Sequence, residues 1–171
     1  MKLSKILLIL FVSVSVLSCK KDDDGESKFV LSNENVAGEH DLVFFKSTIV
    51  ETTNVNGLDV VSTITSTGDT FDVEFDFNAN GTYTASGLYR IVSKTVVNGE
   101  TTDEDAYIET IDISNGTFSA TSSSSVMILD GEAYEVTLFD RDELRIKYED
   151  LITQQNGDTE MTTIEARFVR Q

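Results

Sequence analysis

The fold is decided by the stretch Phe71-Asp72-Val73-Glu74-Phe75-Asp76-Phe77-Asn78-Ala79-Asn80-Gly81-Thr82-Tyr83. Side chains alternate between the two faces of a β-strand, so residues 71–77 place their apolar groups on one face and their carboxylates on the other. This pattern predicts a half-buried strand that ends in a turn at residues 78–81. Aromatic residues occupy alternate positions again from Tyr83 onward, which predicts that a second strand folds back against the first.

The second strand carries two small residues on its predicted inward face. That face is identified by its aromatic content and holds Tyr83, Ala85, Gly87, Tyr89 and Ile91. Small residues between two tyrosines either let the strand bend at the corner of a barrel or leave room for another group. We favour the bend, because it is the more common use of glycine within a strand.

Most of the chain repeats this arrangement of short strands and tight turns. Runs rich in Val, Ile, Thr, Phe and Tyr are separated by Asn-Gly or Asp-Gly pairs, which suit the positive φ angles of hairpin turns. The predicted turns are at Asn56-Gly57, Asn80-Gly81, Asn98-Gly99, Asn115-Gly116, Asp130-Gly131 and Asn156-Gly157. No proline interrupts the runs. We therefore predict an all-β antiparallel meander of roughly eight to ten strands.

Residues 140–152 allow two interpretations. Asp140 to Glu143 have the spacing of a helix capping box, and apolar residues follow at helical intervals. Leu144, Ile146 and Tyr148 equally alternate with charged residues, as in a strand. We predict a strand, because the segment lies between another predicted strand and a predicted turn, and a meander supplies neighbours for both of its edges.

The Phe75–Tyr83 hairpin resembles the hairpin motif of the lipocalin-like domains found in lipoproteins of Gram-negative bacteria. Residues 36–42 are similar to the opening Gly-x-Trp segment of that family, with His40 where the family usually has Trp. Residues 168–170 resemble its closing strand with a terminal Arg. The resemblance implies a lipocalin-like barrel whose base is closed by His40 and Arg170.

Resemblance and strand count lead to the same fold, a single small antiparallel up-and-down β-barrel. Such a barrel has an interior that is either filled by side chains or able to hold one small ligand. Closure also removes the exposed strand edges that favour aggregation. The alternative is a two-sheet β-sandwich, which the regular hairpins without long crossovers disfavour.

The N-terminal residues predict where the protein resides. Two lysines precede an apolar run that is too short to span a membrane, and Val16-Leu17-Ser18-Cys19 resembles a bacterial lipobox. We therefore predict a lipoprotein signal peptide over residues 1–18 and lipidation of Cys19. Several acyl chains on one cysteine would hold the protein on a bilayer without a transmembrane helix.

Residues 19–35 are predicted to form a flexible acidic tether. Within them, Lys20-Lys21-Asp22-Asp23-Asp24 resembles the tag that follows the lipidated cysteine of surface-exposed lipoproteins, with Lys21, Asp22, Asp23 and Asp24 as its core. The same residues could serve only as a solvated tether. If these residues act as an export tag, the predicted location of the protein is the outer membrane, facing the cell exterior.

The composition limits the partners of the chain. The formal net charge of −17 repels nucleic acid and anionic lipid, and it favours a soluble monomer. The single cysteine leaves no intrachain disulfide, so stability must come from a packed core. Residues 36–171 suffice for one domain, without a break in composition that would indicate two.

The sequence offers little for catalysis or metal binding. His40 is the only histidine, Cys19 is assigned to lipid, and no Gly-x-Ser-x-Gly motif occurs. We assign His40 a structural role. The acidic residues within 100–105 lack the spacing of a calcium loop and are interpreted as a solvated loop tip. We therefore predict no enzyme activity, no metal and no cofactor.

Two functions from different classes remain. The first, implied by the lipocalin-like resemblance, is a surface-tethered module that binds a small apolar or amphipathic ligand. Its cavity would be lined by Phe71, Phe75, Phe77, Tyr83 and Tyr89. The second is a non-catalytic structural or interaction lipoprotein, a filled barrel that docks to a protein partner in the envelope. Because an aromatic stripe at strand spacing is more often ordinary core, the volume of the interior decides between them.

Overall fold

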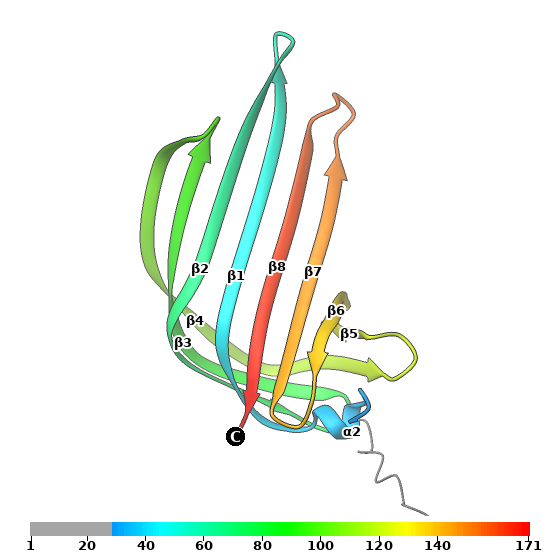
Figure 1. Ribbon diagram of the computed structural model, residues 1–171. Coiled ribbons are helices and arrows are strands. Elements are labelled where there is room, and N and C mark those ends of the chain that lie inside the picture. Colours follow the sequence, from blue (N-terminus) through cyan, green and yellow to red (C-terminus); the bar gives the residue numbers. More distant parts are fainter. Residues whose placement is uncertain (1–28) are drawn as a thin grey trace, which may run out of the picture.

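The computed structural model describes residues 29–171, and most of these belong to one antiparallel sheet. The strands are β1 (Gly38–Val55), β2 (Leu58–Phe77), β3 (Thr82–Val97), β4 (Glu100–Thr121), β5 (Val126–Leu129), β6 (Glu132–Phe139), β7 (Glu143–Thr153) and β8 (Thr159–Arg170). Consecutive strands pair, and β1 also pairs with β8, which closes the sheet into a barrel (Figure 1). The predicted all-β, up-and-down barrel is confirmed with eight strands, and the sandwich is excluded.

The hairpin turns follow the predicted dipeptides with one exception. In Asn56-Gly57, Asn98-Gly99 and Asp130-Gly131 both residues have positive φ angles, the conformation that joins two twisted strands without splaying them. The turn predicted at Asn115-Gly116 is wrong, because both residues lie within β4. Gly116 serves packing there, since a Cβ at this position would collide with the ring of Tyr83.

The segment with two interpretations is a strand, as predicted. β7 begins at Glu143 and pairs with β6 on one edge and β8 on the other. The capping-box spacing forms a tight turn instead of a helix start: the Asp140 carboxylate accepts the backbone N–H groups of Asp142 and Glu143, each at 2.9 Å. A side chain that caps a helix can thus equally stabilise the turn before a strand.

The base of the barrel, where β1 begins and β8 ends, is packed with aromatic side chains. Phe77 is 1% exposed, and the centre of its ring lies 5.1 Å from that of Phe118 and 6.3 Å from that of Phe168. Leu144 and Met127 are fully buried beside them. The alternation predicted for residues 71–77 holds at this end of β2, where apolar side chains face the core.

A short segment before β1 closes the base from below. It contains the helix α2 (Asn33–Val36), in which Val36 is fully buried (Figure 1). The Asn33 side-chain oxygen accepts the backbone N–H of Ala120 in β4 at 2.7 Å. Arg170 at the end of β8 donates to the Ala37 carbonyl oxygen at 2.7 Å and also to the Asn35 carbonyl. We call this segment, residues 31–37, the plug.

The plug begins inside the range that was predicted as a tether. Leu31 is buried in the core, and the ring of Phe29 lies 4.9 Å from that of Phe139 at the end of β6. Packing against the barrel therefore starts before residue 36. The predicted signal peptide 1–18, Cys19 and the tag residues 21–24 lie outside the described residues.

The opposite end of the barrel, which we call the open end, is built differently. Because β5 and β6 are short, β4 pairs with β5 only over Phe118–Thr121, and β7 pairs with β6 only as far as Lys147. Among the described residues, Glu100–Gly116 of β4 and Tyr148–Thr153 of β7 therefore have one unpaired edge. Above β5 and β6 the long strands form a curved trough rather than a closed ring (Figure 1).

Gly87 marks the corner at which β3 turns into this trough. Its φ angle is +129°, and a Cβ at this position would collide with the backbone carbonyl of Asp72 in β2. The pairing of β2 with β3 shifts register at the same place, between Asp69 and Asp72. This close approach of two backbones corresponds to the predicted bend rather than to room for a ligand.

Candidate functional site

A cavity of about 290 Å³ lies inside the barrel above the packed base and opens to solvent. Its wall is mostly apolar: β1 contributes Leu42 and Phe45, β4 contributes Ile111 and Ile113, and β8 contributes Ile164, Ala166 and Phe168. This volume is at the lower end of the range of roughly 300–1,000 Å³ that is usual for ligand pockets. The cavity therefore suits one small molecule with an apolar body.

Three of the five predicted cavity residues line this wall, namely Phe75, Tyr83 and Tyr89. Phe77 does not, because it lies deeper and fills the base. Phe71 does not line it either; its ring stacks on that of Tyr89 at a centroid distance of 5.4 Å and lies over Gly68 of β2, where a Cβ would collide with it. The aromatic stripe of β2 is thus partly core and partly cavity wall.

Sequence reasoning missed the walls contributed by β4 and β8. Ile111 and Ile113 flank Asp112, and Ile164, Ala166 and Phe168 alternate with charged or polar residues, so the two-residue period was present in both strands. These strands face Phe75 and Tyr89 only because the sheet closes. The two-residue period could have predicted the inward faces of these strands, but it could not have predicted the space between them.

Tyr83 is fixed at the cavity wall by an acidic partner. Its hydroxyl donates to one carboxylate oxygen of Asp130 at 2.6 Å, and the other oxygen accepts the Thr117 backbone N–H at 2.7 Å. Burial, together with this carboxylate, raises the pKa of Tyr83, and the Tyr83 hydroxyl lowers the pKa of Asp130. Burial likewise raises the pKa of Tyr89 to about 12. Both phenols are therefore neutral, and Asp130 is charged, near pH 7.

His40 and Arg170, the residues predicted to close the barrel, lie together at the base. They are directly opposite each other on β1 and β8. His40 is 2% exposed, donates from Nδ1 to the Gly38 carbonyl oxygen at 3.0 Å and meets the ring of Phe77 edge-on at 5.5 Å. Burial lowers its pKa. Because His40 does not line the cavity, it has no contact with a molecule bound there.

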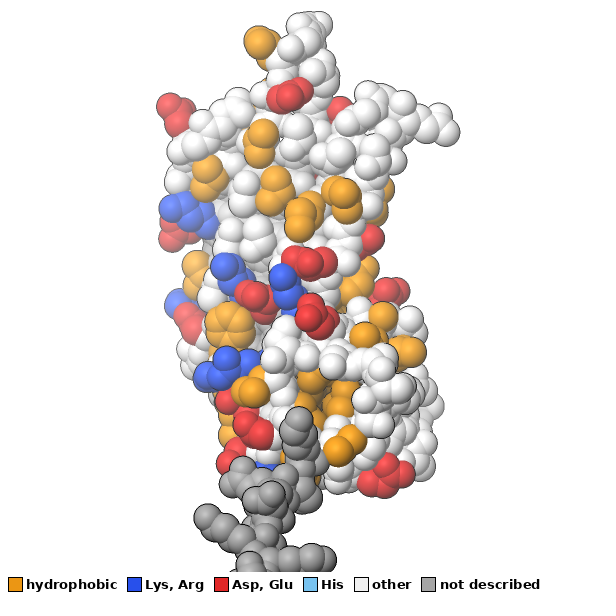
Figure 2. Space-filling view, turned by 45° about the vertical axis from the view of Figure 1, so that its right-hand side comes forward, with side chains coloured by type: hydrophobic (Ala, Val, Ile, Leu, Met, Phe, Trp, Pro, Cys, Tyr) orange, Lys and Arg blue, Asp and Glu red, His pale blue; other side chains and the backbone are white. Residues whose placement is uncertain are grey.

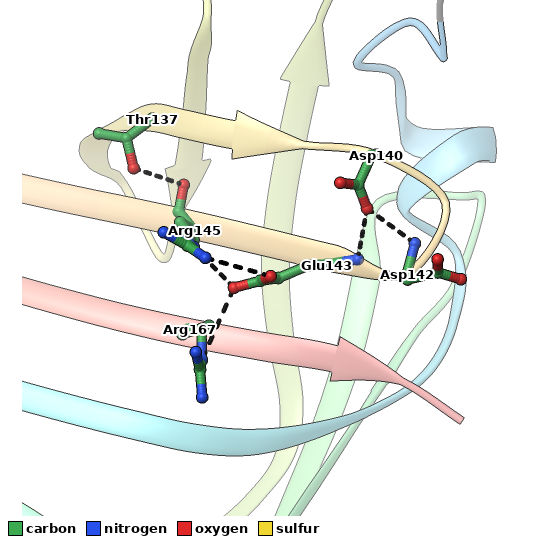
Figure 3. A network of polar contacts seen from close by, with 6 residues as sticks. All are labelled: Thr137, Asp140, Asp142, Glu143, Arg145 and Arg167. Atoms are coloured by element: carbon green, nitrogen blue, oxygen red, sulfur yellow. Dashed lines mark hydrogen bonds and ion pairs between the residues drawn. The ribbon is translucent and has the colours of Figure 1, made fainter.

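The convex outer face of β7 and β8 carries paired charges. Basic and acidic side chains lie side by side across the middle of this face (Figure 2). Arg145 donates to both carboxylate oxygens of Glu143, at 2.6 and 3.3 Å, and Arg167 lies 3.6 Å from the same carboxylate (Figure 3). A groove of about 410 Å³ runs beside these residues. Arg145 is paired with Glu143, whereas the buried Arg167 Nε has no hydrogen-bond partner among the described residues. Because charged residues make up half of its lining, the groove suits an apolar molecule less well than the cavity does.

The acidic residues near the β3–β4 turn do not form a loop tip. Residues 100–105 belong to β4, so their side chains alternate between the two faces. Within residues 29–171, no three His, Cys, Asp or Glu side chains gather in a way that could hold a metal ion. Over the same range, no helix has the length and apolar character needed to cross a membrane.

No family model matches the chain, and no curated protein matches it in sequence. Among solved structures, the chain is similar to an S-type phycobiliprotein lyase from Guillardia theta, with a TM-score of 0.25 and 12% sequence identity. The alignment covers 81% of this chain and 90% of the lyase. A similarity of this strength carries no information on ligand or activity.

Proposed function

We propose that the protein is a surface-tethered lipoprotein whose barrel binds a small apolar or amphipathic ligand in the cavity above the base. The observation that supports this proposal is the open apolar cavity of about 290 Å³. Apolar surface that faces water forgoes about 25 cal/mol of stabilisation for each Å². A ligand with an apolar body recovers this free energy, because it covers the wall that the protein itself leaves uncovered.

The second class of function, a filled barrel that docks to an envelope partner, predicts an interior occupied by side chains. The base meets that description, but the space between Tyr89 and Ile113 does not. The interior thus favours the ligand-binding module over the filled scaffold. Neither function requires catalysis, and the one histidine lies at the base, below the cavity.

The proposed lipid anchor is inferred from the N-terminal sequence. Lipidation of Cys19 would hold the chain at a membrane, and the described chain begins at the base, opposite the open end of the barrel. Replacing Cys19 by Ser should move the protein from the membrane fraction to the soluble fraction. Retention of the Cys19→Ser variant in membranes would refute the anchor.

Ligand binding is best tested by native mass spectrometry of the protein purified without denaturation. The expected result is one additional mass per chain, which is lost in the Ala166→Leu variant because the added atoms enter the cavity. Ala106→Leu is the matched control, since Ala106 is an exposed residue that pairs with Val92 on the outside of β4. A bare chain mass that also resists loading with apolar dyes would refute the proposal.

A further inference from the structure

Basic side chains are confined to one side of the barrel wall, whereas carboxylates lie on both sides. Among the described residues, the strands β1, β3, β7 and β8 carry basic side chains above the base at Lys46, Arg90, Lys94, Arg145, Lys147 and Arg167. Each of these is flanked along its strand by residues that face inward, as Arg145 is by the buried Leu144 and Ile146. Since neighbours on a strand point to opposite faces, all six project from the convex face.

The remaining basic residues of the described chain lie at the base. Arg170 donates to the backbone of the plug, and Arg141 lies in the turn between β6 and β7. The concave side of the described chain, meaning the cavity and the trough above it, therefore presents no basic side chain.

Carboxylates do project from the concave side. Glu132 lines the cavity and pairs with Leu129, which also lines it. Glu109 is directly opposite Tyr89, a residue of the cavity wall, and Asp105 is opposite Ser93. Residues opposite each other in a sheet share a face, so these carboxylates point inward. The negative charge of Glu109 also contributes to the raised pKa of Tyr89, as expected from its position.

Higher in the trough, two carboxylates lie directly across from each other. Glu51 of β1 pairs with Glu160 of β8, and Thr162 beside them pairs with Asp150 of β7. Like charges at opposite positions repel, and a positive charge between them would relieve the repulsion. The trough thus extends the negative potential of the cavity mouth instead of cancelling it.

We infer that the ligand of the cavity is a cationic amphiphile, a molecule with an apolar body and one positively charged group. This inference rests on the proposed ligand-binding function and names the chemical class of the ligand. The apolar body lies against Tyr89, Ile113 and their neighbours, where it buries surface. The charged group lies at the mouth beside Glu132 and Glu109. Low-dielectric walls around a cleft of one sign concentrate molecules of the opposite sign and repel anions such as fatty acids.

The inference is tested with three ligands that share a decyl chain and differ in charge: decyltrimethylammonium, decanol and decanoate. Each is titrated at neutral pH and low salt into the full chain carrying Cys19→Ser, with displacement of the neutral dye Nile red as the readout. We expect the cation to bind about tenfold more tightly than decanoate, with decanol in between. Binding of decanoate as tight as that of the cation would overturn the inference.

The same titration separates the two proposals. If Nile red and decanol bind but the charge of the ligand makes no difference, the cationic class is wrong and the ligand-binding function stands. If neither Nile red, decanol nor the cation binds, both proposals fail.

A pair of double variants locates the charge that selects the ligand. Glu109→Gln with Glu132→Gln removes two inward carboxylates, whereas Glu104→Gln with Glu135→Gln removes two outward ones from the same strands, opposite Lys94 and Lys147. The first variant should weaken binding of the cation about three- to tenfold and leave decanol unchanged, which also shows that the cavity is intact. The second should change binding of the cation less than about twofold. Equal losses in both variants would mean that net charge, not the site, attracts the cation.

Discussion

The base and the open end are built from the same strands but differ in what the inward positions hold. At the base those positions carry Phe77, Leu144 and other large side chains, and the plug covers them. Farther along the same strands a row of serines crosses the concave face, where Ser66 is opposite both Ser47 and Ser93. The difference shows that the inward side chains of an alternating strand form a buried core only where the barrel is closed and the plug covers its end.

The lengths of two strands explain most of this difference. β5 has 4 residues and β6 has 8, whereas β2 has 20. The short pair closes the ring only around the base, so the longer strands continue past it with one face uncovered. A cavity forms at the boundary, where inward aromatic side chains still surround the space but no plug fills it.

The largest expected effect comes from truncating the base. Phe77→Ala should lower the free energy of unfolding by about 3–5 kcal/mol, because the side chain is 1% exposed and leaves a cavity among aromatic rings. Ile64→Ala in the trough should cost less than about 1.5 kcal/mol, since that side chain is only partly buried. Urea unfolding of both variants measures the two losses in the free energy of unfolding. Equal costs would mean that the trough is packed as tightly as the base.

The corner between the two regions is tested by Gly87→Ala. A Cβ would strike the carbonyl of Asp72, and the φ angle of +129° is unfavourable for alanine, so we expect a loss of about 2–3 kcal/mol. Gly99→Ala in the turn of the open end also requires a positive φ angle, but no atom lies near its Cβ, and about 1 kcal/mol is expected. If the two variants unfold at the same urea concentration, the backbones at the corner do not approach as described.

The plug is tested by Asn33→Ala. This change removes the acceptor of the Ala120 backbone N–H and should cost about 1–2 kcal/mol. Asn33→Asp keeps an oxygen at the same position and should recover most of the loss. An Asn33→Asp variant as unstable as Asn33→Ala would show that the hydrogen bond to β4 does not hold the plug.

The base should also be the source of a pH dependence near neutrality. Burial lowers the pKa of His40 in the folded state, so on acidification below about 6.5 the unfolded chain takes up a proton before the folded chain does. Stability should therefore fall as the pH is lowered from 7 toward 5, and His40→Gln should remove this slope. Carboxylates with lowered pKa values, such as Asp130, act at lower pH, since their contribution is lost only as the pH falls through their titration range. A slope that persists in His40→Gln would place its origin elsewhere.

Local patterns were sufficient to predict the all-β fold, most turns, and the faces of residues 71–77 and of β3 and β7. Both the alternation in residues 71–77 and the Asn-Gly turns depend on residues close together in the chain, so they can be recognised from the sequence alone. The turn predicted at Asn115-Gly116 is wrong because Gly116 is required by packing against Tyr83, a residue of another strand. The plug was missed for a related reason, as its partners Ala120 and Arg170 lie far along the chain.

The site was predictable only in part. Phe75, Tyr83 and Tyr89 were assigned to a cavity from their shared strand faces, and they line one. Phe77 shows the same alternation as Phe75 but lies two residues farther along β2, at the covered base, and it is therefore part of the core. Whether the space between opposite walls is filled depends on how far β5 and β6 extend, and no local pattern encodes that distance.

The most direct test of a packed base beneath a ligand cavity is amide hydrogen exchange of the full chain carrying Cys19→Ser, with and without decyltrimethylammonium. We predict that amides at the base, such as Phe77 and Phe118, exchange slowly in both samples. Amides of the β4 wall, such as Ile111 and Ile113, should exchange faster without the ligand and slow when it is added. Exchange at the β4 wall that is already as slow as at the base, or that does not respond to any ligand of the decyl series, would contradict the account.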